Sequence, residues 1–255
     1  MYTVDLNSDL GESFGAFKVG QDEKVLELVT SANIACGYHA GDHNVMAETV
    51  RMAAEKGVGI GAHPGFPDLI GFGRRKIQTT PKDIYNFVVY QISALNGFCQ
   101  IYNAKMQHVK PHGALFNMAS VDQSISEAIA EAVYDSDPSL ILFGLSGSEL
   151  VKAGKKLGLK TANEVFADRT YQPDGTLTAR TEANAMIHDV DEAVAQVLGM
   201  VKDRKCTAVD GSVIELQADT ICVHGDEPSA LAFVQKLRTT LTDEGVILKA
   251  VGDRG

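Results

Sequence analysis

Polar side chains that can exchange protons or bind anions recur along this chain, and each group directly follows an apolar run. Carboxylates and imidazoles are the usual general acids and bases, while amines and guanidinium groups bind phosphates and carboxylates. One such group carries little information, but six of them predict a shared catalytic pocket. The groups are Asp5, Asn7, Asp9 and Glu12; His39 and Asp42; His63; Lys110 and His112; Glu164, Asp168 and Arg169; and His224 and Asp226.

Several of these residues also have a structural interpretation. Asp9 and Glu12 could cap a turn or a helix, and His63 could bond to the backbone. Lys110 is harder to explain in that way, because a buried ammonium is costly without a charged partner. A carboxylate or an anionic substrate would satisfy it.

A histidine pair offers a separate alternative, a metal site. His39 and His43 stand four residues apart and could ligate one ion together, with Asp9 as a third ligand. The simpler interpretation of His43 is an ordinary residue in the first turn of a helix. The residues alone therefore leave the metal question open.

The alternation of polarity around these groups indicates how they are positioned. Val4 and Leu6 alternate with Asp5, Asn7 and Asp9, and the later apolar runs repeat the pattern. Since strand side chains point alternately to opposite faces, each strand has one apolar face and one small or polar face. An open sheet covered by helices on both sides would be apolar on both faces. The pattern instead predicts a closed or nearly closed barrel with its site at the C-terminal strand ends.

Strand-like and helix-like segments alternate along the chain, which predicts an α/β fold. We expect a single domain, residues 1–255, folded as a closed or nearly closed seven-stranded, TIM-like β/α barrel. The predicted strands are Thr3–Asn7, Ala32–Gly37, Val58–Ala62, Gln107–Lys110, Leu140–Phe143, Leu159–Val165 and Thr220–Val223. The predicted helices are Asp22–Val29, His43–Glu55, Pro81–Tyr102, Val121–Tyr134, Ser148–Leu157, Asp189–Val201 and Glu227–Glu244. A hairpin is expected within Cys206–Leu216, and the long loops Gly65–Gln78 and Arg169–Asn184 are expected to be functional.

Composition narrows the class of protein. The 255 residues carry a net charge of -10, which disfavours nucleic acids and anionic membranes as partners. Apolar runs of bilayer length and a signal peptide are both missing from the sequence, so we expect a cytoplasmic protein. The four cysteines have no paired spacing and are predicted to be buried free thiols.

The chain resembles the LamB/YcsF family, the A subunits of bacterial 5-oxoprolinases. The resemblance extends from end to end and is carried by segments in family order. These segments are Val4–Glu12, Ala32–Asp42, Gly61–Gly65, Gly71–Arg75, Val109–Gly113, Glu164–Tyr171 and Cys222–Asp226. One departure is His43, where the family usually has a small residue or proline, which weakens the histidine pair as a family metal site.

The resemblance implies an irregular seven-stranded β/α barrel, similar to that of polysaccharide deacetylases, and an ATP-dependent opening of 5-oxoproline to glutamate. It further implies ATP as co-substrate, expected to act with Mg²⁺, partner subunits B and C, and no tightly bound metal. We assign catalytic roles to Asp9, Glu12, His39, His63, Lys110 and His112. Substrate binding is assigned to Asp5, Asn7, Asn33, Arg74, Glu164, Asp168, Arg169, His224 and Asp226.

Two other functions are compatible with the sequence. The first is a metal-dependent deacetylase or related amidohydrolase acting on an N-acyl sugar. A stoichiometric, tightly held zinc in the purified protein would favour this function. The second is a non-catalytic subunit that presents substrate to a partner. The density of titratable residues on the predicted inner face favours catalysis over presentation.

Overall fold

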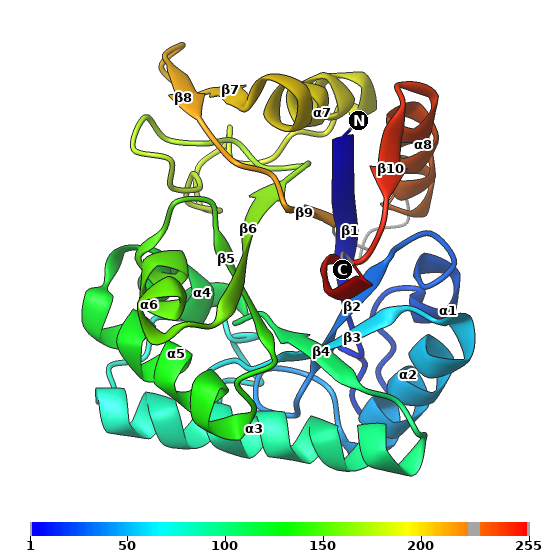
Figure 1. Ribbon diagram of the computed structural model, residues 1–255, viewed down its shortest axis with the longest axis vertical. Helices are drawn as coiled ribbons and strands as arrows, with labels where there is room; N and C mark the ends of the chain where they lie inside the picture. Colours follow the sequence, from blue (N-terminus) through cyan, green and yellow to red (C-terminus); the bar gives the residue numbers. More distant parts are fainter. Residues whose placement is uncertain (1, 224–229, 254–255) are drawn as a thin grey trace.

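The computed structural model describes residues 2–223 and 230–253, and in them seven parallel strands close a barrel. The strands are β1 (Tyr2–Leu10), β2 (Ser31–Ala35), β3 (Gly59–His63), β4 (Met106–Val109), β5 (Ile141–Leu145), β6 (Lys160–Phe166) and β9 (Thr220–Val223). Each strand pairs with the next in this order, and β9 pairs with both β6 and β1. Figure 1 shows the resulting ring with the helices outside it. The predicted seven-stranded β/α barrel is confirmed.

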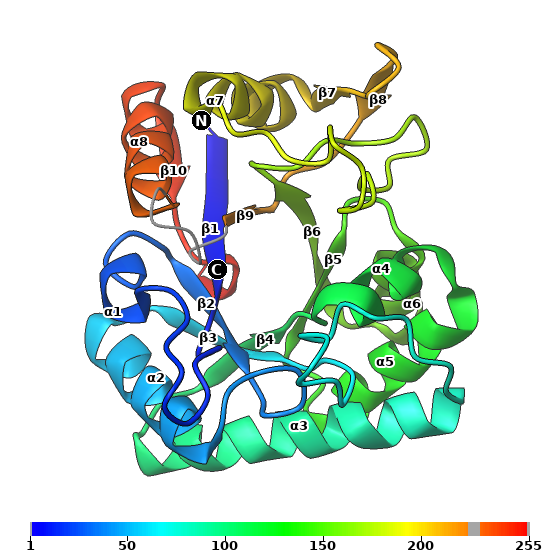
Figure 2. The same cartoon turned by 180° about the vertical axis from the view of Figure 1, so that it is seen from behind.

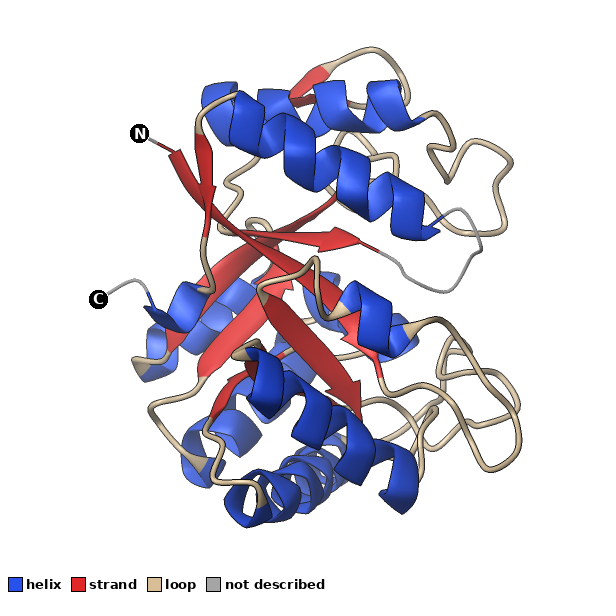
Figure 3. Ribbon diagram, turned by 90° about the vertical axis from the view of Figure 1, so that its right-hand side faces the viewer, coloured by secondary structure: helices blue, strands red, loops and turns tan. Residues whose placement is uncertain are grey.

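Helices cover the outer surface of the ring, as the view from behind and the side view show (Figures 2 and 3). They are α1 (Asp22–Val25), α2 (His43–Lys56), α3 (Pro81–Ile101), α4 (Gly113–Val121), α5 (Gln123–Ser136), α6 (Glu149–Leu157), α7 (Val190–Leu198) and α8 (Ala230–Asp243). A π-helical turn (Gly199–Asp203) extends α7, and a 3-10 turn (Val251–Asp253) follows the last strand. None of the described helices is both long and apolar enough to cross a membrane.

Capping residues explain why several helices begin where the sequence predicts. The side chain of Asp42 accepts hydrogen bonds from the amides of Asn44 and Val45 at the start of α2. Thr80 caps α3, whose first residue is Pro81. Such side chains satisfy amides that have no partner within the helix.

The two faces of the strands differ as the alternation predicts. Val4, Leu6 and Ile34 belong to the large apolar core shared with the helices. The opposite face of β1 carries Asp5 and Asn7, which are fully buried inside the barrel. Polar groups at such depth require partners, and the structure supplies them.

Several features depart from the prediction or complete it. The first helix ends at Val25 instead of Val29, and α4 and the short strand β10 (Val246–Leu248), which pairs with β1, were not predicted. The hairpin within 206–216 is confirmed as β7 (Lys205–Thr207) and β8 (Val213–Glu215). The start of the helix predicted at 227–244 lies outside the described residues. All four cysteines are buried free thiols, as predicted.

Candidate active site

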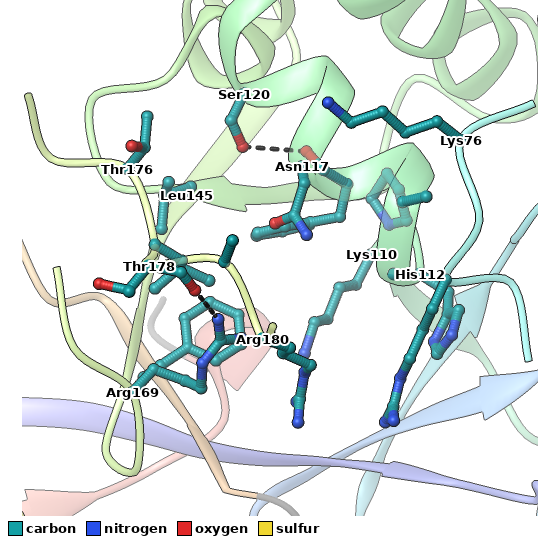
Figure 4. Close-up of a pocket in the computed structure, with 18 of the residues that line it drawn as sticks. Lys76, Lys110, His112, Asn117, Ser120, Leu145, Arg169, Thr176, Thr178 and Arg180 are labelled. Carbon is teal, nitrogen blue, oxygen red and sulfur yellow. Dashed lines mark hydrogen bonds between the residues drawn. The ribbon is translucent and has the colours of Figure 1, made fainter. Parts of the chain in front are cut away.

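A cavity of about 620 Å³ opens at the C-terminal ends of the strands. Its wall includes Asp9 on β1, Glu12 just after β1, His63 on β3, and Lys110 and His112 after β4. Figure 4 shows α4, through Asn117 and Ser120, and the loop after β6, through Thr176, Thr178 and Arg180, around the same space. The structure therefore brings together the acid, amine and imidazole groups that lie far apart in the sequence.

Lys110 is the central cation of the cavity floor. Its Nζ lies 2.9 Å from Oδ1 of Asp9 and 2.8 Å from Oε1 of Glu164. It also donates to Sγ of Cys222 at 3.1 Å. Burial opposes the charge of Lys110, but the two carboxylates raise the pKa of its ammonium well above the usual value. Lys110 is therefore a fixed positive charge, and carboxylates supply the partner that its burial requires.

A buried amide network holds these groups from below. Asn7 Nδ2 donates to Glu164 Oε1 at 3.0 Å, and Asn33 Nδ2 donates to Asp9 Oδ1 at 2.9 Å. His108 Nε2 donates to Asn33 Oδ1 at 2.7 Å. The network orients Asp9 and Glu164 toward Lys110 without contacting the cavity itself.

Three histidines and Glu12 form a second cluster beside Lys110. His39 Nε2 lies 3.1 Å from Oε1 of Glu12, and the His39 ring stacks on that of His112 with centroids 3.6 Å apart. His112 Nδ1 lies 2.9 Å from Nε2 of His63. Burial, reinforced by the neighbouring imidazoles, lowers the pKa of His39 and His112 well below the usual value. Burial raises the pKa of Glu12, an effect that His112 opposes.

The two long loops complete the cavity wall. The loop after β3 approaches α4 closely, and the amide of Ala114 donates to the carbonyl of Gly73 at 2.9 Å. Gly113 has a φ of +52°, and a Cβ there would lie 2.7 Å from that carbonyl oxygen. Only glycine tolerates both conditions easily. The close packing of loop and helix therefore depends on Gly113.

Arg169 organises the loop after β6. Its Nε donates to the carbonyl of Ala185 at 3.2 Å, and its Nη2 donates to the carbonyl of Thr178 (Figure 4). Burial lowers the pKa of Arg169 to about 10, which still leaves the guanidinium charged at neutral pH. Arg169 lines the cavity, but two of its donors are already used in holding 178–185.

The predicted substrate-binding residues divide into two groups. Arg74 and Arg169 line the cavity. Within the described part of the chain, the lining does not include Asp5, Asn7, Asn33, Glu164 or Asp168. Asp5 accepts hydrogen bonds from Thr30, Ser31 and Thr220 deep inside the barrel, which is a structural role. His224 and Asp226 lie outside the described residues.

The metal ligand set considered from the sequence is not the one that the structure assembles. His43 is exposed in the first turn of α2, whereas His39 is buried. Among the described residues, the potential ligand atoms within 4.8 Å of one another belong to Glu12, His39, His63 and His112. Asp42, the neighbour of His43, caps α2 and does not line the cavity.

Sequence reasoning missed His108 and the contribution of α4. His108 is fully buried and stacks on Phe143, and a Cβ at Gly61 would lie 2.1 Å from its Nε2. The period-two alternation places position 108 on the same face as Lys110, so this signal was available. In α4, Asn117 and Ser120 line the cavity.

Comparison with known proteins places this geometry in context. The sequence profile described as the LamB/YcsF family matches residues 4–254. A protein of Halalkalibacterium halodurans, named as the A subunit of 5-oxoprolinase, is 72% identical over 253 residues, covering 99% of this chain and 98% of that one. The crystal structure of a lactam utilization protein from Thermus thermophilus matches with a TM-score of 0.91 and 43% identity, covering 97% and 99% of the two chains. A structure described as T48 deacetylase with substrate matches with a TM-score of 0.51 and 16% identity over 98% and 88% of the chains, a likeness of fold alone.

Proposed function

This chain belongs to the LamB/YcsF family, and on that premise we propose that it is the A subunit of a 5-oxoprolinase. The reaction opens the cyclic amide of 5-oxo-L-proline to L-glutamate, coupled to hydrolysis of ATP to ADP and phosphate. The observation that carries the proposal for this chain is the cavity in which Asp9, Glu12, Lys110 and the imidazoles converge. Hydrolysis of an amide needs this combination of acid, base and fixed positive charge.

The chemistry of a lactam explains why such a site suits the reaction. A five-membered lactam is a stable amide, and water is a poor nucleophile. Phosphorylation of the amide oxygen by ATP activates the ring carbonyl carbon toward water. The water adduct then breaks the C–N bond to give an acyl phosphate, and a second water releases phosphate and leaves glutamate. We propose that the phosphoryl step belongs to the complex, with Mg²⁺, and that subunits B and C assemble with this chain. The single-domain organisation of residues 1–255 and a cytoplasmic location are parts of the same proposal.

Each group at the cavity has a proposed role. Glu12, whose pKa is raised by burial, or Asp9 positions and deprotonates the attacking water. Lys110 and Arg74 favour anionic groups through charge-assisted hydrogen bonds. His63 and His112 exchange the proton that the ring nitrogen requires as the C–N bond breaks. His39 orients Glu12.

The test is a coupled assay of ADP and glutamate release with 5-oxoproline, in which this chain is combined with its partner subunits. We expect Lys110→Ala to abolish turnover, because it removes the fixed charge beside Asp9. Lys76→Ala is the matched control, since Lys76 lines the same cavity but is exposed. Near-normal turnover of Lys110→Ala would remove Lys110 from the reaction.

The same assay separates catalysis from substrate presentation. Asp9→Asn and His63→Gln keep the size of each side chain while changing its acid-base chemistry. A catalytic subunit loses turnover with either variant. Unchanged turnover with both would show that this chain only presents substrate to a partner.

A further inference from the structure

Two backbone carbonyls fix the tautomers of His63 and His112. His63 Nδ1 lies 2.7 Å from the carbonyl oxygen of Lys110, and His112 Nε2 lies 2.8 Å from that of Phe72. Phe72 has a φ of +52°, a conformation uncommon for residues other than glycine, at the point where its carbonyl meets His112. A carbonyl only accepts, so both of these nitrogens must carry a hydrogen. In a neutral imidazole the other ring nitrogen is then a bare lone pair.

When both rings are neutral, the two remaining nitrogens face each other with no hydrogen between them. His63 Nε2 and His112 Nδ1 are 2.9 Å apart. Two acceptors at this distance repel unless a cation, either a proton or a metal ion, lies against both. Two carboxylates lie at the same place: Oδ2 of Asp9 is 3.2 Å from His63 Nε2, and Oε1 of Glu12 is 3.7 Å from His112 Nδ1.

The spacing of these atoms suits a metal ion. Bonds of about 2.0–2.2 Å to a divalent transition metal separate neighbouring ligand atoms by roughly 2.8–3.6 Å. The 2.9 Å and 3.2 Å separations at His63 Nε2 lie in this range, and the 3.7 Å separation of Glu12 from His112 is just above it. A shared proton, with Asp9 as the counterion of His63, is the alternative that the experiment below distinguishes. A ligating histidine also usually donates its second N–H to a carbonyl, as both rings do here. We propose that His63 Nε2, His112 Nδ1 and the carboxylate of Glu12, with Asp9 beside them, bind one divalent cation of the zinc or manganese class.

His39 is close to this point but is not a ligand in the proposal. Its ring is parallel to that of His112, with an interplanar angle of 3° and a centroid separation of 3.6 Å. A metal ion lies near the plane of each imidazole that binds it, and one ion cannot lie in two parallel planes a stacking distance apart. His39 Nε2 instead donates to Glu12, which makes it a positioning residue for that carboxylate.

The proposed ion faces the reaction space, because Glu12, His63 and His112 all line the cavity. A cation there would polarise a bound carbonyl or acidify a bound water. With the ion bound, Glu12, His63 and His112 would be its ligands in place of the acid-base roles proposed for them above, and Asp9 would remain the base for the attacking water. This proposal differs from the expectation, drawn from the sequence, that no metal is tightly bound. Its ligands also do not include His43. It does not depend on the identity of the substrate.

The experiment measures metal binding by the purified full-length chain, with no turnover assay. The chain is stripped with a chelator, dialysed against Zn²⁺, Mn²⁺ or Co²⁺, and analysed for metal content and for the visible absorption of bound Co²⁺. We expect one ion per chain for at least one of these metals. His63→Gln and His112→Gln should each weaken metal binding by at least about 10- to 100-fold. Loss of a residue that only hydrogen-bonds to a metal ligand already lowers metal affinity by that factor. His43→Gln, which changes an exposed histidine, should leave binding unchanged.

Four results would overturn the proposal. The folded wild-type chain could retain none of the three metals, or both Gln variants could bind like the wild type. The third is loss of the ion from His43→Gln, which would identify an adventitious surface site. A ¹⁵N NMR spectrum of the metal-free chain resolves a shared proton between His63 and His112. If that proton persists after metal is added, the cation is a proton and the proposal is wrong. Should a variant misfold, the wild-type stoichiometry and its Co²⁺ spectrum still decide the outcome.

Discussion

Replacement of Lys110 by methionine should destabilise the barrel strongly, because it leaves the carboxylates of Asp9 and Glu164 without a cationic partner. Lys110 is 2% exposed and Glu164 0%, and their charged atoms are 2.8 Å apart. Removal of one member of a buried pair costs about 3–5 kcal/mol, since the other charge remains without compensation. For a chain of this size that loss lowers the melting temperature by roughly 6–20 °C.

The size of the loss should depend on pH. Burial raises the pKa of Glu164, and in the wild type Lys110 opposes that rise. Without Lys110, the pKa of folded Glu164 lies further above its unfolded value of about 4.3. The folded variant then binds more protons than the unfolded chain, so its stability falls as pH rises through that interval. The gap between wild type and variant should therefore be wide at pH 8 and narrower at pH 5.

Urea unfolding followed by circular dichroism at both pH values measures the gap. Lys76→Met is the control, because an exposed lysine should change the free energy of unfolding by no more than about 0.5 kcal/mol. The double variant Lys110→Met, Glu164→Gln should recover part of the loss at pH 8. A loss below about 1 kcal/mol at pH 8, or a gap independent of pH, would refute the reasoning.

Two further predictions concern the loops around the cavity. Gly113→Ala forces a Cβ against the carbonyl of Gly73, so we expect the loop after β3 to move. KM for 5-oxoproline should rise several-fold, and the free energy of unfolding should fall by about 1–3 kcal/mol. Unchanged kinetics would show that the position of this loop does not matter. Arg169→Lys keeps the positive charge but loses the guanidinium donors to the carbonyls of Thr178 and Ala185. Limited proteolysis within 174–181 should therefore become faster. An unchanged cleavage pattern would contradict the role of Arg169 in holding that loop.

The sequence was most informative where side chains alternate along a strand. Asp5, Asn7 and Asp9 share one face of β1, and this pattern was sufficient to predict both a closed barrel and the inward direction of the polar groups. The same rule applied to β4 would have identified His108 beside Lys110. Local periodicity therefore predicts which face a residue occupies.

Periodicity does not predict which polar groups a residue will contact. Arg169 was expected to bind an anion, but carbonyls of the loop after β6 take two of its donors. The helix α4 was missed because it begins without a capping side chain, at His112 and a left-handed Gly113. His39 and His43 belong to the same short segment, yet the turn between them leaves His39 buried and His43 exposed. These outcomes depend on loop conformations that the adjacent residues alone do not determine.

The closure of the ring by β9 against β1 has a consequence for how the chain is made. Lys110 finds its partners on β1, on β6 and, through Cys222, on β9, strands that leave the ribosome early, midway and near the end of synthesis. A growing chain that lacks β9 has an open seam beside β1. The contacts of Lys110 can thus form completely only after translation has passed Val223, because they join residues far apart in the sequence.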